Sequence, residues 1–323
     1  MIYFITGITG YLGTALTRAL LADPRTTRIV GMARHEPGIA AFRQQFHQDG
    51  RVEAWVGDVR DRDRLRWALR TVPDVVIHAA ALKRVELCEA QPSEAVKTNI
   101  DGTRHVVEEA MLANVPKVLV VSSDKSTSAE TCYGKTKAAA EEIALGQNAY
   151  RGDGPTRISV VRYGNVLGST GSFLDQLLEA RSTGGPVTIT DPNATRFWWQ
   201  IDDAVRFVRT VLDQMQGAEI WVPKLVSATV GDLARAIAPQ AIQTVTGMRG
   251  SEKQHEAMIS PTEVSFTYEL PDCYVLLPKR GQWWSPEPPA GAVRVADTFR
   301  YTSNDDPLRV SFEVHEAPSC ALP

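Results

Sequence analysis

The chain opens with the apolar run Ile2-Tyr3-Phe4-Ile5-Thr6, followed by Gly7-Ile8-Thr9-Gly10-Tyr11-Leu12-Gly13. A helical pattern continues through Ala22 and ends at Asp23-Pro24, because proline breaks a helix. The order is therefore strand, glycine turn, helix. Glycines let the backbone approach a pyrophosphate, and a helix N-terminus attracts its negative charge. The spacing is G-x-x-G-x-x-G, and such glycines can serve the turn alone, but in this context they predict a dinucleotide-binding site.

Apolar strands and helical segments alternate up to about residue 165. The expected strands are Arg28–Met32, Val52–Val56, Val75–Ala80, Val118–Val121 and Ile158–Val161. This alternation predicts an α/β fold with a parallel, doubly wound sheet. We expect residues 1–165 to form the dinucleotide-binding domain and residues 166–323 to form mainly a smaller α+β substrate-binding lobe. A strand and a helix at about 187–215 are expected to return to the first domain, and the tail after about 285 is expected to be loop-rich.

The composition is that of an ordinary globular protein. The 323 residues carry a net charge of −3, with 43% hydrophobic and 23% charged residues. The charge provides no basic field for nucleic acid, and no apolar run is long enough to cross a membrane. We expect no signal peptide, because an apolar strand begins within two residues, without a positively charged segment or a cleavage site. The four cysteines show no metal spacing, so we expect a reduced, cytoplasmic protein with no metal site.

The end of the second expected strand bears on the choice of cofactor. An NAD site usually has an acidic residue there for the ribose 2′-hydroxyl. This chain has Ala33-Arg34-His35, with no carboxylate before Glu36. A guanidinium suits a 2′-phosphate, so the sequence favours NADP over NAD. The alternative is an arginine on a solvated loop.

The main candidates for chemistry follow the expected strand at 118–121. Asp124 and Lys125 stand where this strand ends, at the edge where open α/β sheets bind their ligands. Tyr133 and Lys137 are four residues apart and share one face of the next expected helix. We expect Lys137 to lower the pKa of Tyr133, so that the phenol can take a proton from a sugar hydroxyl. The alternative for Asp124 and Lys125 is a surface ion pair.

Four other features have competing interpretations. His78 lies inside an apolar strand, so we expect a core histidine. Cys132 has no visible partner base and is expected to pack rather than to act as a nucleophile. Phe197-Trp198-Trp199 can stack on a base or lie in a core or interface, and the sequence leaves this open. His255 and Glu256 lack a third ligand at helical spacing, which favours a structural role.

Several segments together resemble the inverting UDP-N-acetylglucosamine 4,6-dehydratases, a family of extended short-chain dehydrogenases/reductases. The most specific match is Ser122-Ser123-Asp124-Lys125 with Tyr133 eight residues beyond Lys125. The other matching stretches are Thr6–Gly13, Gly57–Asp61, His78–Lys83, Lys97–Gly102, Tyr133–Lys137, Val161–Val166, Thr195–Trp198, Val222–Lys224 and Arg249–Glu256. This chain departs from the family at Gly250-Ser251, where the family usually has proline and glycine.

The resemblance implies a Rossmann-type fold, bound NADP, a UDP-sugar substrate and a homo-oligomer, either a dimer or a hexamer. It implies catalytic roles for Asp124, Lys125, Tyr133 and Lys137. The glycine turn, the strand ends and the resemblance together assign cofactor contacts to Thr6, Gly7, Thr9, Gly10, Tyr11, Leu12, Gly13, Arg34, Asp58, Val59, Ala79, Ala80, Ala81, Lys83, Asn99, Ser122, Tyr133 and Lys137. The implied substrate contacts are Lys83, Ser123, Asn165, Val166, Arg196, Arg249 and Glu252.

The implied reaction removes water from a UDP-hexosamine with internal hydride transfer from C4 to C6. Tyr133 would take the 4-hydroxyl proton, and Lys125 would remove the C5 proton, which requires a neutral amine with a depressed pKa. Asp124 would protonate the departing 6-hydroxyl, and protonation of the opposite face would invert C5. A UDP-hexose 4-epimerase, which needs only Tyr133 and Lys137, is an alternative. A retaining 4,6-dehydratase, a 5,6-dehydratase and a non-catalytic NADP-binding regulator are the others.

Overall fold

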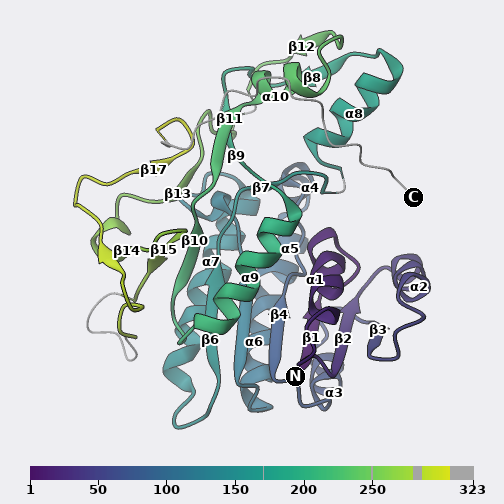
Figure 1. Cartoon of the computed structure of the whole chain (residues 1–323), viewed down its shortest axis with the longest axis vertical. Helices are drawn as coiled ribbons and strands as arrows, with labels where there is room; N and C mark the ends of the chain where they lie inside the picture. Colours follow the sequence, from purple (N-terminus) through teal and green to yellow (C-terminus); the bar gives the residue numbers. More distant parts are fainter. Residues whose placement is uncertain (170, 249, 279–285, 306–323) are drawn as a thin grey trace.

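A large, mostly parallel sheet forms the centre of the protein (Figure 1). The computed structural model describes residues 1–323 except 170, 249, 279–285 and 306–323. Ten strands form the sheet in the order β16-β14-β15-β10-β6-β5-β4-β1-β2-β3. The parallel strands are β1 (Ile2–Thr6), β2 (Arg28–Ala33), β3 (Val52–Val56), β4 (Val75–His78), β5 (Lys117–Val121), β6 (Arg157–Val161) and β10 (Ile220–Pro223). The predicted Rossmann-type, doubly wound sheet is confirmed, with β1 pairing with both β2 and β4.

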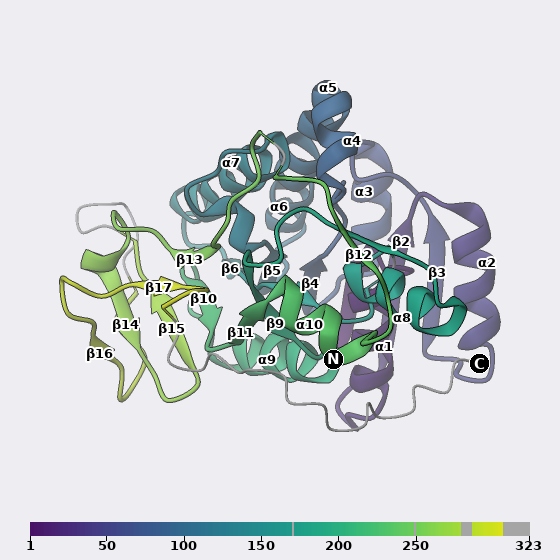
Figure 2. The same cartoon turned by 90° about the horizontal axis from the view of Figure 1, so that it is seen from above.

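Helices cover both faces of this sheet, as Figure 2 shows. On one face α1 (Tyr11–Leu21) contacts α9 (Ile201–Gln214), and on the other α6 (Gly102–Leu112) contacts α3 (Arg62–Leu69) and α7 (Cys132–Gly146). At the sheet edge α2 (Glu36–Gln45) contacts β3. A parallel sheet covered on both faces needs strands that are largely apolar, which accounts for the full burial of β4 and of the three central residues of β5.

A small lobe stands beyond the carboxyl ends of the parallel strands (Figure 1). It contains the helices α8 (Phe173–Thr183) and α10 (Val230–Ile237) and the paired strands β8 (Val187–Ile189) and β12 (Gln243–Val245). A three-stranded sheet of β7 (Asn165–Val166), β9 (Thr195–Trp199) and β11 (Val226–Thr229) lies between the lobe and the large sheet. The lobe has its own core, which includes Leu177, Val187, Ile189, Trp198 and Leu233.

The expected return of a strand near residue 187 to the large sheet is wrong. This strand is β8, and it pairs with β12, because Val187 and Ile189 are buried in the core of the lobe. The chain returns further on, through α9 and then β10, which pairs with β6. The division of the chain at residue 165 stays a prediction.

The segment after residue 256 extends the large sheet rather than the lobe. The strands β14 (Thr267–Glu269), β15 (Cys273–Leu276) and β16 (Val293–Arg294) add an antiparallel edge next to β10, and β13 (Ala257–Ile259) pairs with β17 (Tyr301–Thr302). All four residues of β15 are buried, so this segment needs partners on both faces. Between 286 and 305 regular structure is limited to the two-residue strands β16 and β17, consistent with the expected loop-rich tail.

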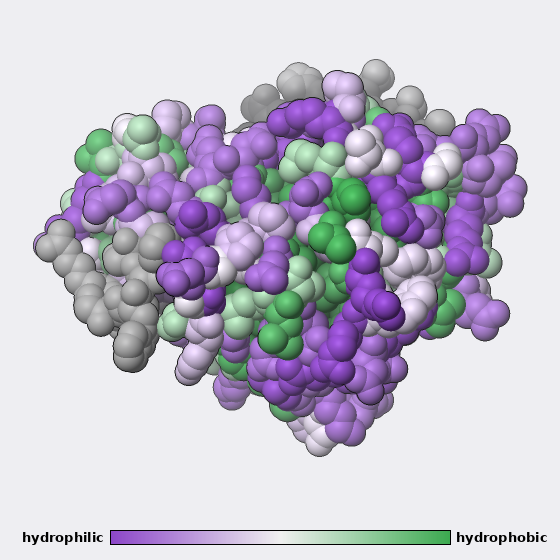
Figure 3. Space-filling model, turned by 90° about the horizontal axis from the view of Figure 1, so that it is seen from below, coloured by the Kyte–Doolittle hydropathy of each residue, from purple (hydrophilic) through white to green (hydrophobic). Residues whose placement is uncertain are grey.

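Figure 3 shows the face opposite the lobe, where hydrophilic side chains predominate and hydrophobic ones stand between them in small groups. Small apolar groups of this kind are ordinary on a protein surface. In the described part of the chain, no helix combines the length and the apolar character needed to cross a bilayer.

Candidate active site

A cleft of about 780 Å³ lies between the lobe and the carboxyl ends of the parallel strands. This is the position where open α/β sheets bind ligands. Many residues predicted for the site line it. Those predicted for the cofactor are Gly7, Thr9, Gly10, Tyr11, Leu12, Gly13, Arg34, Val59, Ala79, Ala80, Ala81, Lys83, Ser122, Tyr133 and Lys137. Those predicted for the substrate or for the reaction are Ser123, Lys125, Asn165, Val166, Arg196 and Glu252.

Four predicted site residues do not line the cleft. They are Thr6, Asp58, Asn99 and Asp124. Each is close to the cleft wall in sequence, but its side chain is held by neighbouring protein groups instead. Arg249, the remaining predicted substrate contact, lies outside the described residues.

The glycine turn between β1 and α1 fits a pyrophosphate. Gly7 has φ of +72°, and a Cβ there would lie 2.9 Å from the Ala80 nitrogen. A Cβ on Gly13 would lie 2.5 Å from the Gly7 carbonyl oxygen. The N-cap Gly10 offers no side chain to satisfy the first N–H groups of α1. These donors at a helix N-terminus suit an anionic group.

Arg34, at the end of β2, lines the cleft and is 45% exposed. Its Nη1 lies 3.8 Å from Asp58 Oδ2, and the same carboxylate oxygen lies 2.7 Å from Arg60 Nη2. Asp58 is therefore paired with two guanidinium groups beside the cleft, while the neighbouring Gly57 and Val59 line it. The prediction that Asp58 contacts the cofactor directly receives no support from this arrangement.

Asn99 connects two segments that border the cleft, the loop after β4 and helix α7. It lies in the π-helix Val96–Asp101 and is fully buried. Its Nδ2 donates to the Leu82 carbonyl and to Thr136 Oγ1, both at 3.0 Å, and its Oδ1 accepts from the Leu82 nitrogen at 2.8 Å. The loop after β4 is thereby tied to α7. Its amide hydrogen bonds therefore go to protein groups, and a direct contact of Asn99 with the cofactor stays a prediction.

His78 and Thr6 are likewise internal. Thr6 Oγ1 lies 2.7 Å from His78 Nδ1, and Thr103 Oγ1 lies 3.0 Å from His78 Nε2. Burial lowers the pKa of His78 to about 3, with a smaller contribution from the Lys137 charge. The imidazole is therefore neutral at ordinary pH, and the expectation of a core histidine is confirmed.

Tyr133 and Lys137 both face the cleft from the first two turns of α7, where Thr131 is the N-cap. Lys137 Nζ donates to the Val121 carbonyl at 2.7 Å, and burial lowers the pKa of this amine to about 8. Burial raises the pKa of Tyr133 to about 12, against the opposing charge of Lys125 and a hydrogen bond with Ser123. The expected lowering by Lys137 is wrong, because burial of the phenol outweighs the favourable contacts.

Asp124 and Lys125 begin the 3₁₀ turn Asp124–Ser126 after β5. Lys125 Nζ donates to Asp124 Oδ1 at 3.1 Å, and Ser123 Oγ donates to the same oxygen at 2.8 Å. The Asp124 side chain is 1% exposed, which contradicts a surface ion pair. Burial alone would lower the pKa of Lys125, but the charges of Asp124 and Glu256 raise it above its usual range. The expected depressed pKa is therefore wrong for this arrangement.

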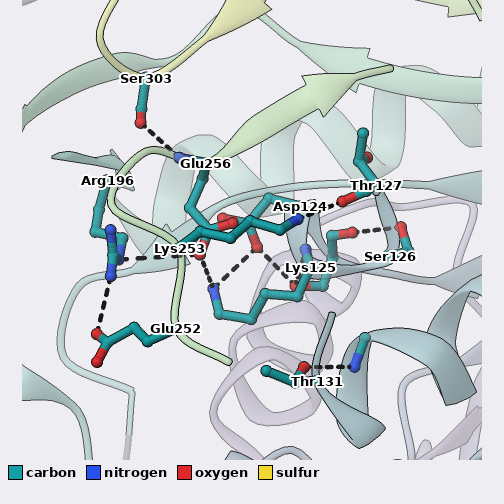
Figure 4. Close-up of polar contacts among 12 residues, drawn as sticks. Asp124, Lys125, Ser126, Thr127, Thr131, Arg196, Glu252, Lys253, Glu256 and Ser303 are labelled. Carbon is teal, nitrogen blue, oxygen red and sulfur yellow. Dashed lines mark hydrogen bonds and ion pairs between the residues drawn. The ribbon is translucent and has the colours of Figure 1, made fainter. Parts of the chain in front are cut away.

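Figure 4 shows a line of alternating charges that the sequence did not reveal. Lys125 Nζ lies 3.7 Å from Glu256 Oε1, which lies 4.0 Å from Arg196 Nε. Arg196 Nη2 in turn lies 3.0 Å from Glu252 Oε1. Glu256 is the site residue that sequence reasoning missed. Two signals pointed to it: its place in the matching stretch Arg249–Glu256 and its pairing with His255. His255 bonds Thr195 Oγ1 through Nδ1 at 2.8 Å instead.

The three aromatic residues of β9 have different surroundings. Trp198 lines the cleft, and its Nε1 donates to the Ala228 carbonyl at 3.3 Å. Phe197 packs against Tyr301, and Trp199 packs against Tyr163, with ring centroids 5.0 and 5.7 Å apart. Trp198 thus belongs to the core of the lobe and also lines the cleft, whereas Phe197 and Trp199 belong to the main core. Cys132 joins a small apolar cluster with Cys88 and Tyr133, consistent with the expected packing role.

A second charged network fixes the far side of the 3₁₀ turn that carries Asp124 and Lys125. Ser126 Oγ donates to Glu141 Oε1 at 2.6 Å, and Glu141 forms an ion pair with Arg162 at 2.6 Å. Arg162 also pairs with Glu263 at 2.7 Å. The turn that carries Asp124 and Lys125 is thus connected to β6, to α7 and to the segment after β13.

The Rossmann-type sheet, with Tyr133 and Lys137 facing the cleft at its carboxyl edge, defines an extended short-chain dehydrogenase/reductase. Within this class, the chain belongs to the polysaccharide biosynthesis protein family, whose model matches residues 3–278.

Relatives of known sequence and structure cover most of the chain. It is 36% identical over 314 residues to the UDP-N-acetylglucosamine 4,6-dehydratase (inverting) of Campylobacter jejuni, covering 95% of this chain and 93% of that protein. It is 33% identical over 280 residues to the UDP-glucose 4-epimerase of Rickettsia massiliae, covering 84% and 81%. The solved structure of Pen from Bacillus thuringiensis matches with a TM-score of 0.87 and 28% identity, covering 94% and 93%. The resemblance to the inverting dehydratases is confirmed.

Proposed function

We propose that the protein is an NADP-dependent UDP-N-acetylglucosamine 4,6-dehydratase that inverts C5. One observation carries this proposal: the buried Asp124 and the cleft-lining Lys125 form a hydrogen-bonded acid–base couple beside Tyr133. Oxidation of a sugar hydroxyl needs only the tyrosine and Lys137. The additional pair of Asp124 and Lys125 suits the loss of water that follows this oxidation. The Campylobacter jejuni relative bears the name of that reaction.

The residues of the cleft fit a dinucleotide. The glycine turn and the N–H groups of α1 would hold the pyrophosphate, Arg34 the 2′-phosphate and Lys137 the nicotinamide ribose. The bound nicotinamide would accept hydride from C4 and return it to C6, and its positive charge would favour the Tyr133 phenolate. The phenolate takes the proton of the 4-hydroxyl, and the resulting 4-ketone makes the C5 proton acidic.

The Asp124–Lys125 couple would supply both the base and the acid that elimination needs. One proton moved from Lys125 Nζ to Asp124 along the 3.1 Å hydrogen bond gives a neutral amine and a neutral carboxylic acid. The amine removes the C5 proton and becomes ammonium. The acid gives its proton toward the 6-hydroxyl, which leaves as water, and becomes carboxylate. The couple then has the same charges as before the reaction. A solvent-derived proton would then add to the opposite face of C5 and invert that centre, while Tyr133 releases the proton of the 4-hydroxyl to solvent.

Because Asp124 does not line the cleft, its proton would travel through Ser123. Ser123 Oγ lines the cleft and hydrogen-bonds Asp124 Oδ1 at 2.8 Å. A hydroxyl can accept one proton while donating another. Ser123 would accept the proton of Asp124 and donate its own to the departing 6-hydroxyl.

The substrate would lie along the lobe side of the cleft. Lys83, Asn165, Val166 and Glu252 line this side, and Arg196 offers a guanidinium for the diphosphate. Trp198 presents an aromatic ring to the same space. A homo-oligomer, either a dimer or a hexamer, is part of the proposal on the basis of the family resemblance. A cytoplasmic location is part of it on the basis of the scattered cysteines.

A UDP-hexose 4-epimerase is the second candidate, because the Rickettsia massiliae relative bears an epimerase name and Tyr133 and Lys137 suffice for that reaction. Incubation with UDP-N-acetylglucosamine in D₂O, followed by NMR and mass spectrometry of the product, separates the two. Loss of one water with deuterium at an inverted C5 is expected. A product of unchanged composition would identify an epimerase, and retention at C5 would identify a retaining dehydratase.

A further inference from the structure

Glu256 is a carboxylate buried beside the amine of Lys125. It precedes β13 and is 4% exposed. Its Oε1 faces Lys125 at 3.7 Å, while its Oε2 has no hydrogen-bond partner among the described residues. A buried carboxylate oxygen without a donor costs stability. A residue kept at such a cost is a candidate for a role in the chemistry of its neighbour.

The backbone around Glu256 is fixed in place. Its N–H donates to Ser303 Oγ at 2.9 Å, and its carbonyl accepts from the Ser303 nitrogen at 2.8 Å. Ser303 Oγ also lies 2.6 Å from Thr195 Oγ1, on the strand that carries Arg196. Glu256 is therefore held against β9 by a buried hydrogen-bonded cluster, and its carboxylate has a defined distance from Lys125.

The charges that face Lys125 come from four elements. Asp124 precedes it in the 3₁₀ turn, Glu256 reaches it from the segment before β13, Arg196 from β9 and Tyr133 from α7. The two carboxylates favour the ammonium form, and Arg196 and burial oppose it. Asp124 is assigned to the exchange of protons with Lys125, and Glu256 is the second carboxylate beside the amine, without a part in that exchange.

We infer that Glu256 is a positioning residue, which holds Lys125 Nζ opposite Asp124 and strengthens Lys125 as the base at C5. This inference rests on the proposed function. A carboxylate at 3.7 Å stabilises the ammonium that forms when Lys125 takes a proton from carbon. The same negative charge also lowers the fraction of Lys125 that is a neutral amine at neutral pH. The increase in the base strength of Lys125 and the decrease in its neutral fraction can be measured separately.

The first test measures the free amine without any turnover. Trace acetylation of the full-length protein with acetic anhydride at one mildly alkaline pH, followed by mass spectrometry, gives the reactivity of Lys125 relative to Lys97, whose side chain is 59% exposed. Glu256→Gln keeps the shape and removes the charge. We expect Lys125 in this variant to react about threefold or more faster, because each unit by which its pKa falls frees about tenfold more amine.

Glu252→Gln is the matched control for this measurement. Glu252 carries the same charge on the same segment, but its ion pair is with Arg196. Its removal is expected to change Lys125 reactivity by less than about twofold, because the positive charge of Arg196 weakens the effect of Glu252 on Lys125. Equal reactivity of Lys125 in wild type and Glu256→Gln would overturn the inference. If that variant does not fold, Glu256→Asp decides, because withdrawing the charge by one methylene should raise reactivity, and a wild-type value would overturn the inference.

The second test uses the reaction. In Glu256→Gln we expect kcat for water loss to fall about 10- to 100-fold, as for the impairment of one acid–base group. We expect the rising limb of its pH profile to move to lower pH, whereas loss of mere structural support would leave the limb in place. A protein that releases no water from UDP-N-acetylglucosamine would disprove the proposed function, while the acetylation result would still decide whether Glu256 controls Lys125.

Discussion

Lys125 Nζ lies 3.1 Å from Asp124 Oδ1, yet of these two side chains only that of Lys125 lines the cleft. The base can therefore touch a sugar carbon directly, whereas the acid has to act through a neighbour. Ser123 is the neighbour that both bonds Asp124 and lines the cleft. This asymmetry leads to different expectations for the three residues.

Lys125→Ala should abolish the direct base. We expect water loss to slow by about 10²–10⁴-fold, the usual contribution of one general acid–base group, with UDP binding unchanged by calorimetry. Lys135→Ala is the matched control, because Lys135 lies on α7 but is exposed and does not line the cleft. Normal turnover by Lys125→Ala would refute the assignment.

Ser123→Ala should interrupt the proton path from Asp124 while keeping the Asp124–Lys125 pair. We expect kcat for water loss to fall about 100-fold, within the range of one proton-transfer group. Ser123→Thr retains a hydroxyl and should recover most of the rate. If the alanine variant were as fast as wild type, Asp124 would have to deliver its proton by another route.

Arg34→Ala should separate the two cofactors. A charge-assisted hydrogen bond to a 2′-phosphate contributes about 1.5–3 kcal/mol, so we expect NADP affinity to fall about tenfold or more and NAD affinity to change little. Fluorescence titration of each cofactor measures this. Arg60→Ala provides the control, because Arg60 also pairs with Asp58 but does not line the cleft. Equal losses for NADP and NAD would remove the argument for NADP.

His78 should make the fold sensitive to acid. The native imidazole has a pKa of about 3, against the ordinary value of 6.5. The unfolded chain therefore binds more protons between these values, so stability is full above pH 6.5 and is lost as the pH falls toward 3. The loss is about 1.4 kcal/mol per pH unit in that window.

Urea unfolding of wild type and His78→Asn at about pH 7.5 and pH 5 measures this effect. We expect wild type to lose about 2 kcal/mol more than the variant between the two conditions, from the same linkage. The comparison cancels the hydrogen bonds that the substitution removes at both pH values. Identical pH dependence in the two proteins would show that His78 is not buried neutral.

The sequence predicted those parts of the fold and site that depend on local pattern. The strand–glycine turn–helix unit and the Tyr133–Lys137 spacing are of this kind, because each is set by neighbours within a few residues. The role of β8 was missed, since a short apolar strand does not reveal which core will bury it. The pKa directions of Tyr133 and Lys125 were missed because burial and the charge of Glu256 arise only in the folded chain.

Asn99 illustrates the same limit. Its sequence context indicated a packing or site role without deciding between them, and its three hydrogen bonds go to Leu82 and Thr136, which are distant in sequence. No local sequence signal distinguishes an asparagine that binds a ligand from one whose amide hydrogen-bonds to protein groups behind the cleft.

The hydrogen bonds between Glu256 and Ser303, together with the ion pair between Arg162 and Glu263, have a consequence for truncated forms of this enzyme. A fragment that stops near residue 250 would retain the glycine turn, Tyr133 and Lys125. It would lack the anion beside the amine and the anchor of the turn that carries it. Such a fragment should still bind nucleotide while turning over poorly, so the last quarter of the polypeptide tunes chemistry encoded in the first half.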